Sequence, residues 1–313
     1  TLPGNCAIFT MTETNSGDVI IADYNSSLYK KSFGSINWVP IDFQGRKVRF
    51  LTMLSDGTLY AISGQGSYIQ SSVSMIHRST DNGITWQTVF SRNFPYNNAV
   101  GGALTVLQDG SILAGIPVQR GPTIGDIVWS YIYKSTDNGL SWFQKDSIQL
   151  GWPQGLLTTG SNKILMGTTF DGVYRSVSGG NFWLPVDTTA HMIGSRYTNA
   201  MGKSREGNIY IAQNYKVMKS TNEGINFDAF STPSGNVVIN SMCVVSDNEI
   251  YISTDDKKVY FSATGGSSWQ LMTTGLPAGA NVYALGMLAG KLYAATYSYG
   301  VFYYEPDAVS ISN

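Results

Sequence analysis

Short alternating apolar segments, each bounded by turn residues, recur along the whole chain. Residues 163–167 (Lys-Ile-Leu-Met-Gly) and 173–176 (Val-Tyr-Arg-Ser) flank the turn Phe170-Asp171-Gly172. Alternation of β-branched or aromatic residues with polar ones, between Gly, Asp and Asn, is typical of strands joined by hairpins. Related segments return elsewhere, as in Gly57–Ala61 and Gly290–Ala294. The pattern therefore predicts an all-β protein built from repeated units.

Each unit ends in an eight-residue box of the form S-x-D-x-G-x-(T/S)-W. The two best copies are Ser79–Trp86 and Ser135–Trp142, and looser copies are Ser176–Trp183, Ser220–Phe227, Ser262–Trp269 and Lys31–Trp38. The aromatic residues that close the boxes recur about every 45 residues, and a period in this range with four short strands per unit indicates a β-propeller.

A seventh unit lies at the end of the chain. Gly300–Tyr303 matches Gly172–Arg175, although Tyr304, Pro306 and Ile311 replace the key residues of the box. We therefore predict an all-β, seven-bladed β-propeller of four-stranded antiparallel blades, forming a single domain over residues 1–313 and closed by packing of the last blade on the first. Six blades with a C-terminal tail is the alternative. The expected blades span about 5-43, 47-92, 98-148, 154-189, 195-232, 237-275 and 280-313.

The chemistry of the box indicates a structural role at the turn between the third and fourth strands. Glycine supplies a positive φ, a short carboxylate accepts backbone N–H groups of its own turn, and burial of the closing aromatic contributes about 1.5–3 kcal/mol or more. Asn222 replaces the aspartate in the fifth copy and can accept the same bonds. Structural roles are therefore expected for Asp81, Gly83, Trp86, Asp137, Gly139, Trp142, Trp183 and Trp269.

The composition argues against several partners. The 313 residues include 20 basic and 21 acidic ones without a basic stripe, which argues against nucleic acids and anionic membranes. No apolar run approaches the length of a membrane span. Because only 13% of residues are charged while Ser, Thr, Asn, Tyr and Gly are plentiful, we expect a secreted or cell-surface monomer whose leader has been removed.

Cofactor and metal sites are not expected. Cys6 and Cys243 are separated by a blade, so two thiols are favoured over a disulfide. His77 and His191 lie far apart in the sequence, which leaves no cluster of metal ligands.

Function is expected on the face opposite the boxes, among features that do not repeat. The hairpins between the second and third strands are extended at Gly64–Gln70 in blade 2 and Gln119–Asp126 in blade 3. These extensions form either ligand-binding loops or merely longer strands. Trp129 and Trp152 are the tryptophans that close no box. Exposed aromatic residues with polar neighbours suit stacking on sugar rings and also suit protein partners, although packing between blades is an alternative for any single tyrosine. The predicted ligand-binding residues are Trp152, Trp129, Tyr68, Arg120, Tyr96 and Phe170.

The boxes resemble the Asp box, also called the BNR repeat, and the resemblance to Asp-box propellers covers essentially the whole chain. That superfamily includes sialidases, xyloglucan-cleaving endoglucanases, sortilin-type receptors and photosystem II stability and assembly factors. The motif implies a fold and hardly any particular activity. The chain looks closest in type to the seven-bladed assembly factors and to propellers related to xyloglucanases and sialidases.

The sequence departs from the enzymes of that superfamily. Sialidases carry an Arg-Ile-Pro motif, whereas Gly115 precedes Ile116-Pro117 here. Xyloglucanase-type enzymes place two aspartates between two tandem propellers, and this chain supplies one propeller. A glycoside hydrolase needs two carboxyl groups about 5–10 Å apart. The candidates on the second face form no convincing pair; they are Asp23, Asp126, Asp171, Asp187, Asp255 and Asp256.

The favoured function is therefore a non-enzymatic propeller that binds a ligand, first of all a glycan, through the second face. A protein-docking or assembly scaffold is the alternative, and a glycoside hydrolase is the third possibility.

Overall fold

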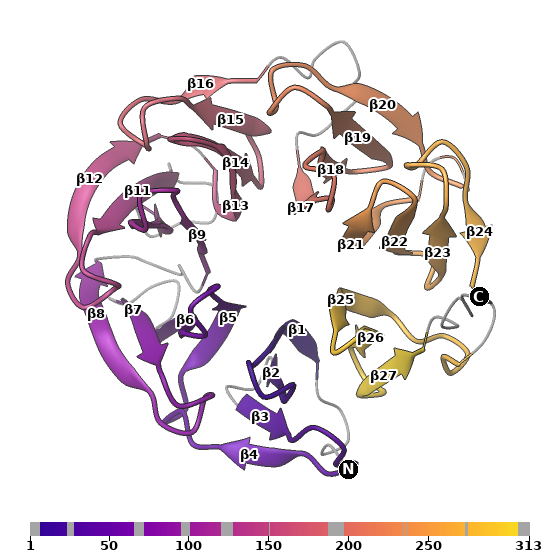
Figure 1. Ribbon diagram of the computed structural model, residues 1–313, viewed down its shortest axis with the longest axis horizontal. Coiled ribbons are helices and arrows are strands. Elements are labelled where there is room, and N and C mark those ends of the chain that lie inside the picture. The colour runs from indigo at the N-terminus through magenta and orange to yellow at the C-terminus, as the bar shows by residue number, and fades with distance from the viewer. Residues whose placement is uncertain are drawn as a thin grey trace, which may run out of the picture.

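A computed structural model describes residues 7–23, 28–65, 72–94, 101–119, 128–149, 151–186, 197–233, 235, 237–272 and 275–305. These residues contain strands and turns but no helix. The strands form seven antiparallel sheets arranged as a ring around a central axis, as Figure 1 shows. No described segment forms a helix that could cross a membrane.

Each sheet is one blade, and its strands follow the order of the sequence from the axis outward. Blade 1 contains β1 (Ile8–Glu13), β2 (Val19–Asp23), β3 (Leu28–Lys31) and β4 (Val39–Ile41); blade 2 contains β5 (Lys47–Met53), β6 (Leu59–Gln65), β7 (Ser72–Ser79) and β8 (Gln87–Phe94); blade 3 contains β9 (Ala103–Val106), β10 (Ile112–Gln119), β11 (Val128–Ser135) and β12 (Phe143–Ile148); blade 4 contains β13 (Pro153–Gly160), β14 (Lys163–Thr168), β15 (Val173–Ser176) and β16 (Leu184–Pro185). Blade 5 contains β17 (Thr198–Lys203), β18 (Ile209–Gln213), β19 (Lys216–Ser220) and β20 (Asp228–Ser231); blade 6 contains β21 (Ile239–Ser246), β22 (Glu249–Thr254), β23 (Val259–Ser262) and β24 (Gln270–Leu271); blade 7 contains β25 (Val282–Leu288), β26 (Lys291–Thr296) and β27 (Val301–Tyr304).

The prediction of a seven-bladed all-β propeller is confirmed, and the six-bladed alternative is wrong. Residues 282–304 form a three-stranded sheet within the described chain, and this sheet lies in the ring between blades 6 and 1 (Figure 1). Strand β25 contacts both β21 and β1. The last blade therefore packs on the first, as the matching segments of the sequence predicted.

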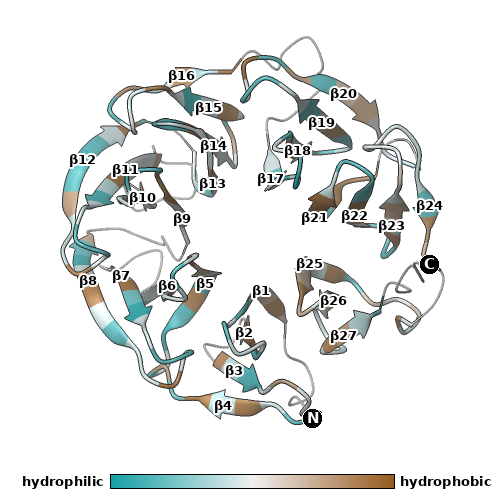
Figure 2. Ribbon diagram, in the orientation of Figure 1, coloured by the Kyte–Doolittle hydropathy of each residue, from teal (hydrophilic) through white to brown (hydrophobic). Residues whose placement is uncertain are grey.

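The second strand of each blade forms the centre of the core. Strand β2 is buried at every position, and so is β18. Both faces of such a strand pack against neighbouring blades, because each sheet stands between two others. This explains the continuous apolar runs, such as Val-Ile-Ile-Ala at 19–22. In Figure 2 apolar residues lie along the strands, whereas the connecting turns are more hydrophilic.

The box lies at the turn between the third and fourth strands, as expected. In blade 2, Asp81 Oδ1 accepts the backbone N–H groups of Ile84 at 3.1 Å and Thr85 at 2.9 Å. Gly83 adopts a φ of 77°, and its carbonyl accepts the indole N–H of Trp86 at 3.1 Å. Asp137 makes the corresponding bond to Ser141 N–H at 2.9 Å. These contacts are those that a turn-fixing role requires.

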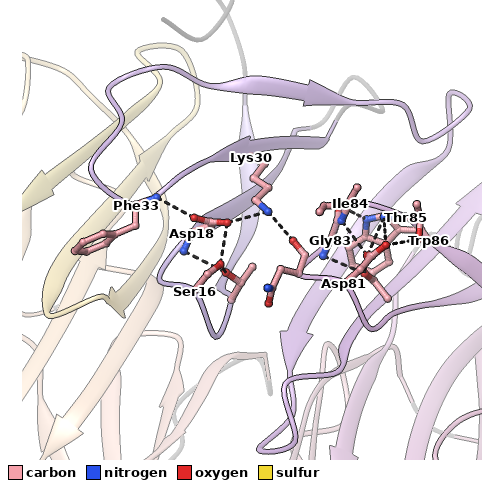
Figure 3. A network of polar contacts seen from close by, with 12 residues as sticks. Ser16, Asp18, Lys30, Phe33, Asp81, Gly83, Ile84, Thr85 and Trp86 are labelled. Carbon is pink, nitrogen blue, oxygen red and sulfur yellow. Dashed lines mark hydrogen bonds and ion pairs between the residues drawn. The ribbon is translucent and has the colours of Figure 1, made fainter.

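In several blades the box also contacts the blade before it. Lys30 Nζ of blade 1 forms an ion pair with Asp18 at 2.8 Å and donates to the carbonyl of Asn82, inside the box of blade 2, at 2.9 Å (Figure 3). Asn82 has a φ of 55°, a left-handed conformation that asparagine tolerates. Arg175 Nε donates in the same way to the carbonyl of Glu223 in blade 5, at 3.2 Å.

The extensions in blades 2 and 3 lengthen their strands. Pairing of β6 with β7 runs from Leu59↔Ser79 to Gln65↔Val73, and β10 pairs with β11 from Ile112 to Gln119. In blade 4 the equivalent pairing ends at Gly167↔Val173. Part of each extension is therefore longer strand, and residues 66–71 and 120–127 lie outside the described residues.

Candidate functional site

A β-bulge recurs near the start of the innermost strand in six blades. In each case two successive residues of the second strand face residues that are two apart on the first, so one residue of the first strand is left over. Such a bulge leaves its extra residue unpaired in the ladder and redirects the side chain. The extra residues are Phe9, Arg49, Gln154, Asn199, Asn240 and Tyr283.

All six bulge residues line one cavity of about 630 Å³. The remaining blade, blade 3, contributes Gly102, which precedes β9 and also lines the cavity. The cavity lies where the innermost strands begin. Strand direction alternates within a blade, so this is the end opposite the boxes. The six bulges and Gly102 therefore place one residue from every blade around the axis on the predicted ligand face, and we call these seven positions the bulge ring.

Three of the seven positions of the bulge ring, Phe9, Arg49 and Tyr283, are aromatic or cationic. The rings of Phe9 and Tyr283 have centroids 5.7 Å apart, and Tyr283 lies 5.7 Å from Tyr297. Arg49 Cζ lies 4.7 Å from the Phe9 centroid. Tyr283 is 36% exposed and Tyr297 is 51% exposed. Blades 7, 1 and 2 thus present accessible aromatic surface beside a guanidinium group held by a cation–π contact.

Three further positions of the bulge ring are amides, from blades 4, 5 and 6. Asn199 Nδ2 donates to the carbonyl of Ile239 at 2.5 Å, and Gln154 Nε2 donates to Thr169 Oγ1 at 2.5 Å. Asn240 Nδ2 donates to Asn281 Oδ1 at 3.1 Å. These bonds hold the amides in place, and an amide has both donor and acceptor capacity.

The described wall of the cavity has one charged residue, Arg49, and no carboxylate. Three of the described candidate acids of this face accept hydrogen bonds from protein groups, and the fourth is buried. Asp171 accepts the N–H of Gly151 at 2.5 Å, and Asp255 accepts that of Val238 at 3.0 Å. Asp256 accepts from Thr254 and Lys258, and Asp23 is buried. Asp126 and Asp187 lie outside the described residues.

The predicted ligand-binding residues differ in whether they line the cavity. Trp152 lines the cavity and is partly buried, and its Nε1 is covered without a hydrogen-bond partner. Trp129 lies on β11 opposite Val118 and is not part of the described cavity wall. Phe170 is half exposed, and its ring meets that of Tyr197 edge-on at 5.0 Å. The structure therefore brings Trp152 to the cavity without Trp129. Tyr68, Arg120 and Tyr96 lie outside the described residues.

The sequence analysis assigned no ligand-binding role to any of the seven positions of the bulge ring, although a signal is present. Each bulge residue comes one position before a residue that is usually small and two before Met or Leu, as in Asn199-Ala200-Met201, Asn240-Ser241-Met242 and Tyr283-Ala284-Leu285. Gly102-Ala103-Leu104 continues this pattern. The alternation of apolar and polar residues predicts strands only with regular pairing, so these residues were expected at ordinary strand positions.

The remaining titratable candidates are buried packing residues. His77 contacts Ser63 Oγ at 2.7 Å and Thr88 Oγ1 at 3.0 Å, and burial, aided by the charge of Arg46, lowers its pKa to about 4. Burial raises the pKa of Cys243 to about 11. Cys6 and His191 lie outside the described residues. The described part of the chain contains no group of three His, Cys, Asp or Glu residues that could hold a metal ion.

Comparison with known proteins shows the fold. No protein-family model matches the sequence, and none of the curated proteins does. The solved structure of YCF48 from Cyanidioschyzon merolae is similar, with a TM-score of 0.72, 15% identity and coverage of 98% of each chain. A structure of YCF48 bound to D1 peptide has a TM-score of 0.70, 17% identity and coverage of 99% of this chain and 96% of that one.

An enzyme is also among the similar structures. The GH74 enzyme of Niastella koreensis has a TM-score of 0.75 and 17% identity over 99% of this chain and 54% of its own length. The chain thus spans about half of that enzyme. At these identities the likeness establishes a β-propeller, and residue roles depend on this chain's own geometry.

Proposed function

We propose that this protein is a non-enzymatic binding propeller that takes a glycan at the bulge ring. The observation that carries the proposal is that accessible aromatic rings and hydrogen-bonded amides lie on different sides of one cavity. Sugar rings stack on aromatic faces through their C–H groups, and their hydroxyls need partners that both donate and accept. A cavity of about 630 Å³ also falls within the usual range for small-ligand sites.

Tyr283 is the central residue of this proposal. It lies between Phe9 and Tyr297 and is accessible at the rim, where a sugar ring can stack on it. The described cavity wall holds no carboxylate, whereas glycoside hydrolysis generally uses two. These features favour binding over cleavage.

The test is glycan binding by the purified protein and three variants. Screening on a glycan panel, followed by calorimetry, is expected to show binding that falls about tenfold or more in Tyr283→Ala. Trp152→Ala tests the second aromatic residue of the wall and is expected to weaken the same binding. Phe182→Ala is the matched control, because this ring is 62% exposed and lies in a box on the opposite face. Absence of binding to every glycan, or equal losses in all three variants, contradicts the proposal.

A polypeptide ligand is the second candidate. Its support is the similarity to YCF48 over almost the whole of both chains, together with the structure of YCF48 bound to D1 peptide. Fixed Asn and Gln side chains can bind peptide groups as readily as sugar hydroxyls. Affinity capture with the native protein and with Tyr283→Ala discriminates the two. A stoichiometric protein partner lost in that variant, together with a silent glycan panel, favours the polypeptide.

We further propose that the protein acts as a secreted or cell-surface monomer and that its boxes belong to the Asp-box class. The low proportion of charged residues supports the location, and the hydrogen bonds of Asp81 and Asp137 support the class. Cell fractionation tests the location, and sedimentation of the purified protein tests the monomer. Recovery of the native protein only in the cytoplasm contradicts the location.

A further inference from the structure

Charge is distributed asymmetrically around the bulge ring. Arg49 is the charged member of the described cavity wall, which otherwise presents amides, aromatic rings, glycines and aliphatic groups. The cavity is thus lined by one positive charge with no acidic residue among the described lining. A ligand carrying a negative group complements such a wall, and a second cation is disfavoured.

The guanidinium of Arg49 is held in place by its surroundings. Arg49 is the bulge residue of β5, so its side chain is turned out of the regular ladder. Its Cζ stacks 4.7 Å from the centroid of Phe9, and its Nη1 is covered by protein while the residue as a whole is only partly buried. An arginine restrained in this way loses little conformational freedom on binding, and a carboxylate would be bound through guanidinium N–H groups other than those of the covered Nη1.

The aromatic neighbours define where the rest of such a ligand lies. Phe9 connects Arg49 to Tyr283, because the Phe9 ring contacts both the guanidinium and the tyrosine ring. The Phe9 ring therefore lies between the Arg49 guanidinium and the tyrosine on which a sugar would stack. The amides of Gln154, Asn199 and Asn240 line the other side of the cavity, where hydroxyl groups need partners.

We propose that the ligand is an acidic glycan and that Arg49 binds the carboxylate of a uronic acid unit. This inference rests on the proposed function, since it specifies which glycans occupy the bulge ring. It assigns Arg49 the selection of acidic over neutral sugars and leaves stacking to Tyr283. The two roles are separable by mutation, because one depends on charge and the other on an aromatic face.

The experiment uses uronic acid oligosaccharides and their carboxyl-reduced forms, in which the carboxylate becomes a hydroxymethyl group and the stereochemistry is kept. Oligogalacturonate and alginate oligosaccharides, each beside its reduced form, are titrated into the whole protein by calorimetry. We expect the wild type to prefer the acidic member of at least one pair by about 10- to 100-fold, the usual strength of a hydrogen-bonded charge contact. Arg49→Gln is expected to abolish the preference, and Arg49→Lys to retain part of it.

The control variant has the same net charge as Arg49→Gln. Arg205→Gln also removes one positive charge, from an exposed turn at the opposite end of blade 5, and is expected to leave the preference unchanged. Thermal unfolding of each variant shows whether the fold is retained. If Arg49→Gln fails to fold, Arg49→Lys supplies the test, because an unchanged preference in that variant contradicts a role for the planar guanidinium group.

The outcomes separate this inference from the proposed function. Equal affinity of the wild type for acidic and reduced forms, or a preference that survives Arg49→Gln, overturns the role of Arg49. If a neutral glycan then binds and Tyr283→Ala weakens that binding, the proposed function stands without the inference. Absence of binding to every acidic and neutral glycan overturns both.

Discussion

Tyr60 of blade 2 donates a hydrogen bond from its hydroxyl to the backbone carbonyl of Asn138, 2.8 Å away in the box of blade 3. Tyr60 is fully buried, and Asn138 has a φ of 55°, as Asn82 does in the previous blade. The left-handed residue of the box thus turns its carbonyl toward the preceding blade, where a side chain can donate to it. The repeated motif is therefore a contact between blades as well as a turn.

Tyr60→Phe is expected to destabilise the protein by about 1–2 kcal/mol, since it removes the hydrogen bond between a buried tyrosine and the carbonyl of Asn138 in a partly buried contact between blades. Denaturant unfolding measures the loss. Tyr303→Phe is the matched control, because its ring is exposed, and it is expected to change stability by less than about 0.5 kcal/mol. Equal effects of the two substitutions contradict the role of this hydrogen bond.

Gly83→Ala is expected to lower the free energy of unfolding by about 2–4 kcal/mol, because alanine is strained at a positive φ and because its methyl group overpacks the core. Gly83 has a φ of 77°, and a Cβ there would meet the side chain of the fully buried Ile20 in blade 1. Gly34 occupies the worn box of blade 1 with a φ of 75° and nothing within 4 Å. Gly34→Ala carries only the backbone strain and is expected to cost about 1 kcal/mol. Unfolding midpoints of the two variants separate strain from packing.

The box carboxylates are expected to make stability depend on pH in strongly acidic solution. Hydrogen bonds from the hydroxyl and N–H of Ser141 lower the pKa of Asp137 from 3.8 to about 2. A carboxyl group with a depressed folded-state pKa stabilises the fold above its unfolded pKa and loses that contribution as the pH falls through its folded pKa. Asp137 should therefore contribute fully above about pH 4 and progressively less down to pH 2.

The variant Asp137→Asn removes this titration and keeps an acceptor oxygen, as Asn222 does in blade 5, where its Oδ1 accepts the N–H of Asn226 at 3.0 Å. The difference in unfolding midpoint between wild type and variant is expected to shrink as the pH falls from 4 to 2. The wild type and the variant share the other carboxylates whose pKa is lowered, such as Asp81 and Asp18, so the contribution of those groups to the pH dependence cancels in the difference. A difference that stays constant over this range argues against the assignment.

Lys31→Met is expected to weaken the junction of the first and last blades. Lys31 Nζ lies 5.8 Å from the Trp38 ring, 5.3 Å from the Tyr293 ring and 5.5 Å from the Tyr303 ring, and donates to Tyr293 Oη at 3.1 Å. The loss of these cation–π contacts should cost about 1 kcal/mol.

Hydrogen exchange is the more specific measurement for this junction, because faster exchange should be confined to blades 1 and 7. Lys203→Met is the control, since Lys203 is exposed in blade 5. Unchanged exchange at β1 and β25 in Lys31→Met contradicts a role in ring closure.

Much of the scaffold could be predicted because its signals are local. The box at Ser79–Trp86 contains its own glycine, its own acceptor and its own indole donor, so eight residues suffice to specify the turn. Repetition of that turn about every 45 residues then predicts the number of blades. The decayed seventh box still allowed this prediction, because the strands at Lys291–Thr296 and Val301–Tyr304 kept the pattern.

The candidate site could be predicted only in part. The sequence singled out Trp152 because it is a tryptophan outside any box, and Trp152 lines the cavity, whereas its role in binding stays a prediction. Arg49 and Tyr283 were missed, because each is one residue in a strand and the pattern of alternation does not show that a bulge occurs there. Trp129 was grouped with Trp152 through composition, whereas the pairing of β11 with β10 keeps Trp129 away from the cavity wall.

Local chemistry in the chain thus determines the turns, the strands and the sevenfold repeat, since each depends on contacts between residues close in sequence. The bulge ring depends on closure of the propeller. Phe9 and Tyr283 stand near opposite ends of the chain, and their rings lie 5.7 Å apart because blade 7 packs on blade 1. A cavity with one cation, an aromatic side and an amide side arises only when all seven blades meet at the axis, and tertiary packing alone brings them there.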